Sequence, residues 1–104
     1  MTSGLDRLLA DPTRLAIMSV LDVAEWCDFA FLREAVSLSD SALSKQLTTL
    51  RKEGYVEQQR TYAGRVPKTT VRATDEGRQR FLGHAEALRA IVERPRTGSP
   101  AKST

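Results

Sequence analysis

A regular apolar pattern occupies the middle of the chain. Leu43, Leu47 and Leu50 recur at i, i+4 and i+7, which places them on one side of a helix. Ser39 is a suitable N-cap, because its hydroxyl can accept a hydrogen bond from a backbone N–H at the helix start. Gly54 is suited to end the helix, because glycine adopts the left-handed conformation at little cost. The pattern therefore predicts an amphipathic helix between these two residues.

The opposite side of this helix, over residues 39–53, carries hydroxyl groups and lysines and no acid. Small hydroxyls let a helix approach a DNA duplex closely, and lysine neutralises phosphate or donates to guanine. The alternative is an ordinary amphipathic helix with a solvated polar side. If the helix enters the major groove, the residues expected to contact bases are Ser41, Ser44, Lys45 and Thr48. Those expected to contact the DNA backbone are Ser39, Thr49 and Lys52.

The N-terminal part of the chain predicts two helices. The first covers residues 5–10 and has its leucines on one side. The second begins at Pro12, with Asp11 as the N-cap, and extends to about Glu25. Because apolar residues cover most of the circumference of the second helix, we expect it to lie at the centre of the core.

A third helix is predicted over residues 29–36, with Asp28 as its N-cap. Ser37-Leu38 forms a short turn between this helix and the one over residues 39–53. Two helices joined by a turn of a few residues, the second with a polar outer side, form a helix-turn-helix arrangement.

Two segments rich in β-branched and aromatic residues follow. They cover residues 55–63 and 66–73, and Gly64-Arg65 between them predicts a β-hairpin with a glycine at its tip. Beside a recognition helix, a basic hairpin acts as a wing that can reach the DNA backbone or the minor groove, where arginine is favoured. Alternatively, the hairpin only covers the edge of the core, and its charges protect that edge. The wing residues expected to contact DNA are Arg60, Tyr62, Arg65 and Lys68.

A long helix is predicted from its N-cap, Thr74, to about Arg94. Together with the leucines of residues 5–10, its apolar stripe offers more apolar surface than one small domain needs. We therefore expect a two-fold dimer interface, with packing inside the monomer as the alternative. The expected interface residues are Leu5, Leu8, Leu9, Phe81, Leu82, Ala85, Leu88, Ile91 and Val92. Residues 95–104 are expected to be a disordered tail.

Length and composition fit one globular domain. The chain has 104 residues, of which 40% are hydrophobic and 28% charged, and the predicted domain covers residues 1–94. Residues 41–72 contain seven basic and two acidic side chains, whereas residues 1–40 contain three and seven. Positive charge gathered in this way is typical of a nucleic-acid-binding surface. Neither a signal peptide nor a membrane span is expected.

Few residues suggest other chemistry. The single cysteine, Cys27, allows no intramolecular disulfide, which fits a reducing cytoplasm. We expect it to be a small buried residue, with a redox-sensing thiol as the alternative. His84 is expected at the surface or at an interface, and without further ligands neither residue predicts a metal site. No catalytic constellation or cofactor motif is found, so we expect no enzyme. Four aromatic residues belong either to the core or to a ligand cavity: Trp26, Phe29, Phe31 and Tyr55.

The whole pattern resembles a known family. The stretches LDRLLADPTRLAIMSVL, DFAFLREAVSLSDSALSKQLTTLRKEGYVE and GRVPKTTVRATDEGR are similar to small winged helix-turn-helix transcriptional regulators of the MarR and ArsR type, over residues 5–92. The resemblance implies a homodimer that binds a pseudo-palindromic operator, usually as a repressor near its own gene. That group often has Gly-Asn in place of Ser41-Ala42 and His in place of Gln46, so the operator sequence is not implied.

The expected fold is mainly α with a small β-hairpin, namely a three-helix core, a two-stranded wing and a long C-terminal helix. The expected function is sequence-specific binding of double-stranded DNA by a cytoplasmic homodimer. A protein-interaction module without sequence-specific DNA binding is the alternative, because fold alone does not fix function. A sensor whose small-molecule effector releases DNA is a refinement of the first reading.

Overall fold

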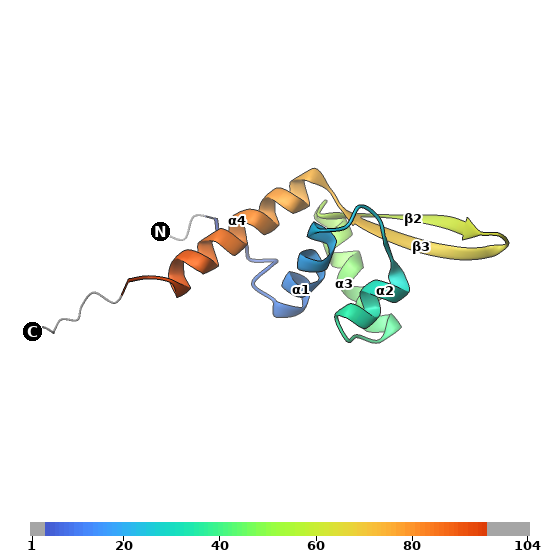
Figure 1. The fold of residues 1–104 in the computed structure, drawn as a ribbon, viewed down its shortest axis with the longest axis horizontal. Helices are drawn as coiled ribbons and strands as arrows, with labels where there is room; N and C mark the ends of the chain where they lie inside the picture. Colours follow the sequence, from blue (N-terminus) through green and yellow to red (C-terminus); the bar gives the residue numbers. More distant parts are fainter. Residues whose placement is uncertain (1–3, 96–104) are drawn as a thin grey trace, which may run out of the picture.

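The computed structural model describes residues 4–95 and contains four helices and a three-stranded antiparallel sheet (Figure 1). The predicted winged-helix fold is confirmed. The β2–β3 hairpin projects from one side of the helical group, and the C-terminal half of α4 projects from the other. The elements are α1 (Pro12–Asp22), β1 (Cys27–Asp28), α2 (Phe29–Ala35), α3 (Asp40–Lys52), β2 (Val56–Ala63), β3 (Val66–Ala73) and α4 (Asp75–Val92).

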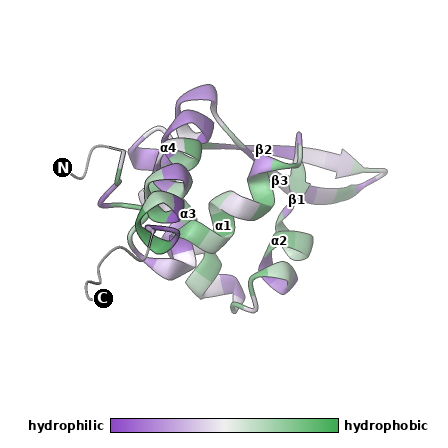
Figure 2. Cartoon of the chain, turned by 60° about the vertical axis from the view of Figure 1, so that its left-hand side comes forward, coloured by the Kyte–Doolittle hydropathy of each residue, from purple (hydrophilic) through white to green (hydrophobic). Residues whose placement is uncertain are grey.

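The core forms where α1 and α3 meet the sheet. Ile17, Met18 and Leu21 of α1 are fully buried, as expected for a central helix. The three leucines of the α3 stripe pack against them with Val71 of β3. Hydrophobic residues dominate α1, whereas β2 is mostly hydrophilic (Figure 2). This contrast agrees with a wing that extends beyond the core.

The prediction of a helix over residues 5–10 is wrong, because this segment is a series of turns. The Oδ1 atom of Asp6 accepts hydrogen bonds from the N–H groups of Leu8 and Leu9, at 2.8 and 3.1 Å. This is the bonding of an N-cap, and the Ala10 N–H closes one turn after it on the Asp6 carbonyl at 2.9 Å. Asp11 and Pro12 then begin α1, so the turn does not continue into a helix.

A short strand, β1, was not predicted. Cys27 pairs with Val71 of β3, which makes the strand order β1-β3-β2. To reach this position the chain leaves α1 at Asp22, three residues before the predicted end at Glu25. Two residues are too few to show a strand pattern, so only the pairing partner defines this strand.

The remaining helix ends agree with the predictions to within two residues, since α2 ends at Ala35 and α4 at Val92. Among residues 4–95, no helix is both long and apolar enough to cross a membrane. The predicted tail lies, apart from Pro95, outside the described residues.

Candidate nucleic-acid interface

Helix α3 turns its polar side to solvent because its leucines are buried in the core. The hydroxyl of Ser39 accepts a hydrogen bond from the N–H of Ala42 at 3.1 Å, which confirms the predicted N-cap. The exposed residues of α3 include Ser41, Ser44, Lys45, Thr48 and Lys52, whereas Thr49 is half-buried. The predicted base-contacting residues therefore form one accessible row.

Two hydroxyls of α3 already donate to the helix backbone, namely those of Thr48 in this row and of Thr49 beside it. The hydroxyl of Thr48 donates to the carbonyl of Ser44 at 2.9 Å, and that of Thr49 donates to the carbonyl of Lys45 at 3.4 Å. Because the hydrogen is used, the Thr48 oxygen is left as an acceptor. Acceptors of this kind match the amino groups of adenine or cytosine in the major groove.

The β2–β3 hairpin forms the predicted wing. Ala63 pairs with Val66, so Gly64 and Arg65 make a two-residue tip. Gly64 has a φ of 67°, in the left-handed region that favours glycine. Arg65 is exposed at this tip, the end of the wing that lies farthest from the helices (Figure 1).

The wing and α3 share a cleft. Since side chains alternate along a strand, Arg60 and Tyr62 lie on the same side of β2 as the buried Val56. Beyond the core, this side of the wing borders a cleft of about 460 Å³ whose lining includes Ser44 and Arg60. The fold thus brings a base-contacting candidate and a backbone-contacting candidate to one surface.

Lys68 also lines this cleft, but its charge is already paired. Its Nζ atom lies 3.2 Å from Oδ2 of Asp28, the residue before α2. Asp28 was predicted to cap α2, yet its side chain makes no capping hydrogen bond within residues 4–95. The lysine therefore has to leave this partner before it can contact a phosphate.

Other cations of the basic region are also engaged. Arg72 lies 3.3 Å from Glu57 and its guanidinium carbon is 5.1 Å from the centre of the Trp26 ring. Arg51 donates to the side-chain oxygen of Gln58. Five basic residues of α3 and the wing make no ion pair within the described part of the chain, namely Lys45, Arg51, Lys52, Arg60 and Arg65, and only Arg51 among them makes a side-chain hydrogen bond there.

Residues 13–92 match the family described as winged helix DNA-binding domain. The chain belongs to this family. A protein of Methanocaldococcus jannaschii, itself uncharacterised, is 36% identical over 72 residues, which cover 68% of this chain and 77% of that protein. The winged-helix family and the fold point to a DNA-binding transcriptional regulator.

Solved structures share the fold. A transcriptional regulator homologue from Pyrococcus horikoshii OT3 is 26% identical with a TM-score of 0.79, covering 85% of this chain and 87% of that one. NadR in complex with 4-hydroxyphenylacetate is 19% identical with a TM-score of 0.70, covering 83% and 63%. The MarR family regulator SPO1453 from Silicibacter pomeroyi DSS-3 is 20% identical with a TM-score of 0.60, covering 79% and 57%.

The structure contains a buried polar cluster, formed by Asp6, Tyr55 and His84, that sequence reasoning missed. Oδ2 of Asp6 accepts a hydrogen bond from the Tyr55 hydroxyl at 2.5 Å, and the Asp6 N–H donates to Nδ1 of His84 at 2.9 Å. His84 is only 2% exposed, so the expectation of a surface or interface histidine is wrong. The three residues come from distant parts of the sequence, and no local pattern links them.

The environment changes the acidity of two groups in this cluster. Burial by itself raises the pKa of Asp6, but hydrogen bonds from Tyr55 and from the backbone N–H groups of Leu9 and Leu8 outweigh it and lower that pKa below its usual value of 3.8. Burial and the hydrogen bond to Asp6 raise the pKa of Tyr55 to about 12. The carboxylate is therefore charged and the phenol neutral at neutral pH.

Arg14 connects the N-terminal segment to the recognition helix. Its Nε donates to the carbonyl of Leu8 at 2.7 Å, and its Nη1 donates to the side-chain oxygen of Gln46 at 3.0 Å. Gln46 is half-buried beside α1 and does not belong to the exposed row of α3. Gln46 therefore links α3 to Arg14 of α1 behind the exposed row.

The predicted dimer residues divide by exposure. Leu9 is fully buried in the core of its own chain, so its assignment to an interface is wrong. Phe81 packs against the same core. Leu82, Ile91 and Val92 are 51%, 48% and 79% exposed. The remaining candidates, Leu5, Leu8, Ala85 and Leu88, are half-buried.

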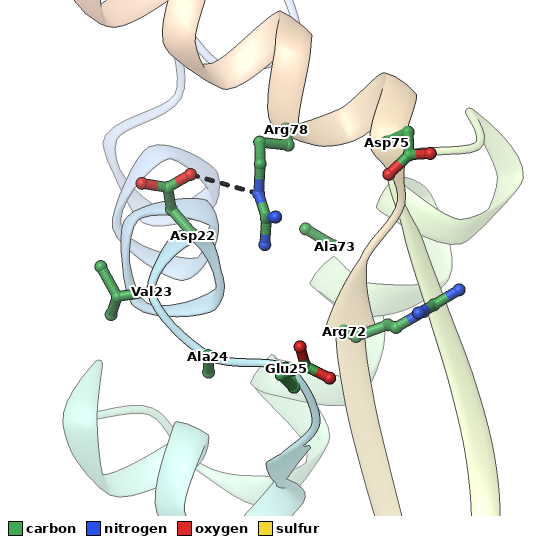
Figure 3. Close-up of a pocket in the computed structure, with 8 residues that line it drawn as sticks. All are labelled: Asp22, Val23, Ala24, Glu25, Arg72, Ala73, Asp75 and Arg78. Atoms are coloured by element: carbon green, nitrogen blue, oxygen red, sulfur yellow. Dashed lines mark ion pairs between the residues drawn. The ribbon is translucent and has the colours of Figure 1, made fainter.

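A polar pocket of about 370 Å³ lies between the end of α1, β3 and the start of α4 (Figure 3). Nε of Arg78 is 3.4 Å from Oδ1 of Asp22, an ion pair by distance whose geometry is not that of a hydrogen bond. Figure 3 shows the Arg78 guanidinium between the two helices, whereas Arg72 points away. This pair ties α4 to α1.

Cys27 is 4% exposed in β1, which confirms the expectation of a small buried residue. Burial, and next the charge of Asp28, raise the pKa of its thiol, so the reactive thiolate is disfavoured. The described residues hold no group of three or more His, Cys, Asp or Glu that could bind a metal. The four aromatic residues have different surroundings, since Tyr55 and Phe29 pack in the core, Arg72 lies over the ring of Trp26, and Phe31 is 62% exposed.

Proposed function

We propose that this chain is a homodimeric repressor that binds a pseudo-palindromic operator, with α3 in the major groove and the wing on the backbone or in the minor groove. The observation that carries the proposal is the accessible row of hydroxyls and Lys45 on α3, beside a wing whose tip bears an unpaired arginine within the described residues. A row without acids suits the negative surface of DNA.

The proposed contacts fall into two groups. The side chains that contact base edges are those of Ser41, Ser44, Lys45 and Thr48. The side chains that contact the DNA backbone are those of Ser39, Thr49, Lys52, Arg60, Tyr62 and Arg65. Lys68 joins them when its ion pair with Asp28 breaks. Phosphate contacts fix the position of the protein, and only base contacts select the sequence.

The proposed dimer is supported by apolar side chains that one chain leaves exposed. Ile91 and Val92 lie at the end of α4 that extends beyond the helical group (Figure 1), and Leu82 is also half-exposed. A second copy related by a two-fold axis would cover them and place the two recognition helices about 34 Å apart, one turn of DNA.

The test is a footprint of the purified protein on DNA flanking its own gene, at two salt concentrations. We expect protection of a two-fold symmetric site that weakens as salt increases. If neither this DNA nor random duplex binds at low salt while the protein stays folded, the basic surface instead serves a protein partner.

A small-molecule effector is a second candidate function, favoured by an apolar cavity of about 520 Å³. Its lining includes Leu5, Leu15, His84 and Leu88, between the N-terminal segment and α4. NadR binds 4-hydroxyphenylacetate, which makes this compound a first probe. Binding would raise the melting temperature with ligand concentration, whereas an unchanged value at millimolar concentration would exclude this compound as a ligand.

A further inference from the structure

The ion pair between Asp28 and Lys68 lies at an unusual place for an acidic residue. Both side chains are partly exposed, at 43% and 47%, with 3.2 Å between Oδ2 and Nζ. An aspartate that precedes a helix usually binds the first N–H groups of that helix. The Asp28 carboxylate makes no such bond among residues 4–95 and is turned to the wing lysine instead.

This pair belongs to the cleft between α3 and the wing. Asp28 and Lys68 line the same cleft as Ser44 of α3 and Arg60 of β2. Figure 1 shows α2 and α3 beneath the base of the wing, and residues at the start of α2 line the cleft together with Ser44 of the recognition helix. A carboxylate on this surface repels phosphate, and it also neutralises the lysine that would attract phosphate.

We propose that Asp28 lowers the affinity of this surface for DNA of any sequence, because it holds Lys68 in an ion pair and adds a negative charge where phosphates pass. The inference rests on the proposed DNA-binding function and deepens it. Affinity for non-specific DNA is almost entirely electrostatic. When the affinity for non-specific DNA is lower, the preference of the protein for its operator depends more on the base contacts of α3.

A second ion pair of the same sheet provides a matched control. Glu57 pairs with Arg72 across β2 and β3 at 3.3 Å, and Arg72 is further held against Trp26. Arg72 lines the pocket at the end of α1, not the cleft beside α3. Replacing Glu57 by Gln therefore changes the net charge by the same amount as replacing Asp28 by Asn, but away from the proposed DNA surface.

The experiment measures binding of the full chain to a random-sequence duplex by fluorescence anisotropy between 50 and 200 mM salt. For Asp28→Asn we expect tighter binding at low salt and a log–log salt slope steeper by about 0.9, which is the contribution of one additional contact between a lysine and a phosphate. Glu57→Gln should leave the slope unchanged. In the double variant Asp28→Asn with Lys68→Met, the slope should return to that of the wild type. Circular dichroism melting confirms that each variant folds.

Three results would overturn the inference. One is a slope for Asp28→Asn no different from that of Glu57→Gln. Another is a gain in slope that persists without Lys68, which would exclude the ion pair as its cause. The third is failure of both the wild type and Asp28→Asn to bind any duplex, which would refute the proposed function as well. Binding by Asp28→Asn alone would support the inference.

Discussion

At the tip of the wing, Arg65 is exposed and makes no ion pair within the described residues. If it contacts a phosphate, Arg65→Ala weakens binding to every DNA sequence and reduces the log–log salt slope by about 0.9. Anisotropy titrations at several salt concentrations measure this slope. An unchanged slope would show that Arg65 contacts no phosphate.

Lys45 is the cation in the middle of the exposed row of α3. If it donates to guanine, Lys45→Ala removes the preference at one base pair, worth about 1–3 kcal/mol, and leaves the other positions unaffected. A panel of single-base operator variants, titrated with both proteins, measures this change. Equal weakening on all variants would identify Lys45 as a backbone contact.

The Asp6 carboxylate stabilises the fold in a pH-dependent way. Its pKa is below 3.8 in the folded protein, so its contribution is fully present above that pH and is lost as the pH falls through the lowered pKa. We expect Asp6→Asn to be less stable than the wild type at pH 7 by about 2 kcal/mol, because hydrogen bonds to a charged group are lost.

Urea unfolding of both proteins at pH 7 and pH 3 measures this effect. The difference in unfolding free energy between them should shrink at the lower pH, because the Asp6 carboxyl of the unfolded wild-type chain, with its ordinary pKa of 3.8, takes up a proton there and favours unfolding. A difference that does not change with pH would show that Asp6 acts only through its shape and its neutral hydrogen bonds.

At the scale of elements, α4 packs against the backbone of Tyr55 through Gly77. A Cβ atom added there would lie 2.1 Å from the carbonyl oxygen of Tyr55, so the helix approaches the start of β2 as closely as glycine allows. At Gly83 of the same helix, the nearest atom to an added Cβ is a carbonyl oxygen at 3.8 Å. The two glycines therefore have different roles.

Gly77→Ala should destabilise the protein by about 1–3 kcal/mol, because the backbone must shift to relieve the overlap. Gly83→Ala, its matched control, should stabilise by about 0.5–1 kcal/mol, because alanine is the better helix former. Thermal and urea unfolding compare the two variants. Equal effects of the same sign would contradict this docking geometry.

Elements with a strong local pattern were predicted well. The α3 helix has its N-cap, its leucine stripe and its end at adjacent positions of the sequence, and the wing has its glycine-containing tip. The β1 strand and the turns of residues 5–10 were missed or wrong. Both depend on partners elsewhere, since β1 exists through its pairing with β3, and Asp6 of the turns is held by Tyr55 and His84.

At the scale of the whole molecule, the proposed dimer predicts that function depends on the exposed end of α4. Ile91→Asp should shift the protein to monomers in sedimentation equilibrium and weaken operator binding, because a charge is placed in an apolar interface. Val23→Asp is the control, since Val23 is 86% exposed at the end of α1 and outside the proposed interface. Two variants with the same oligomeric state would contradict this interface.

The sequence by itself determined the helices, the wing and the polar side of α3. These features depend on residue spacing, caps and turn residues, which act over a few neighbouring positions. Only the tertiary structure decided which charges are paired and which polar groups are buried. Lys68 meets Asp28, and Asp6 meets His84 across 78 positions of the chain. Such contacts arise when the folded elements meet, so the accessible part of a basic region is a property of the fold.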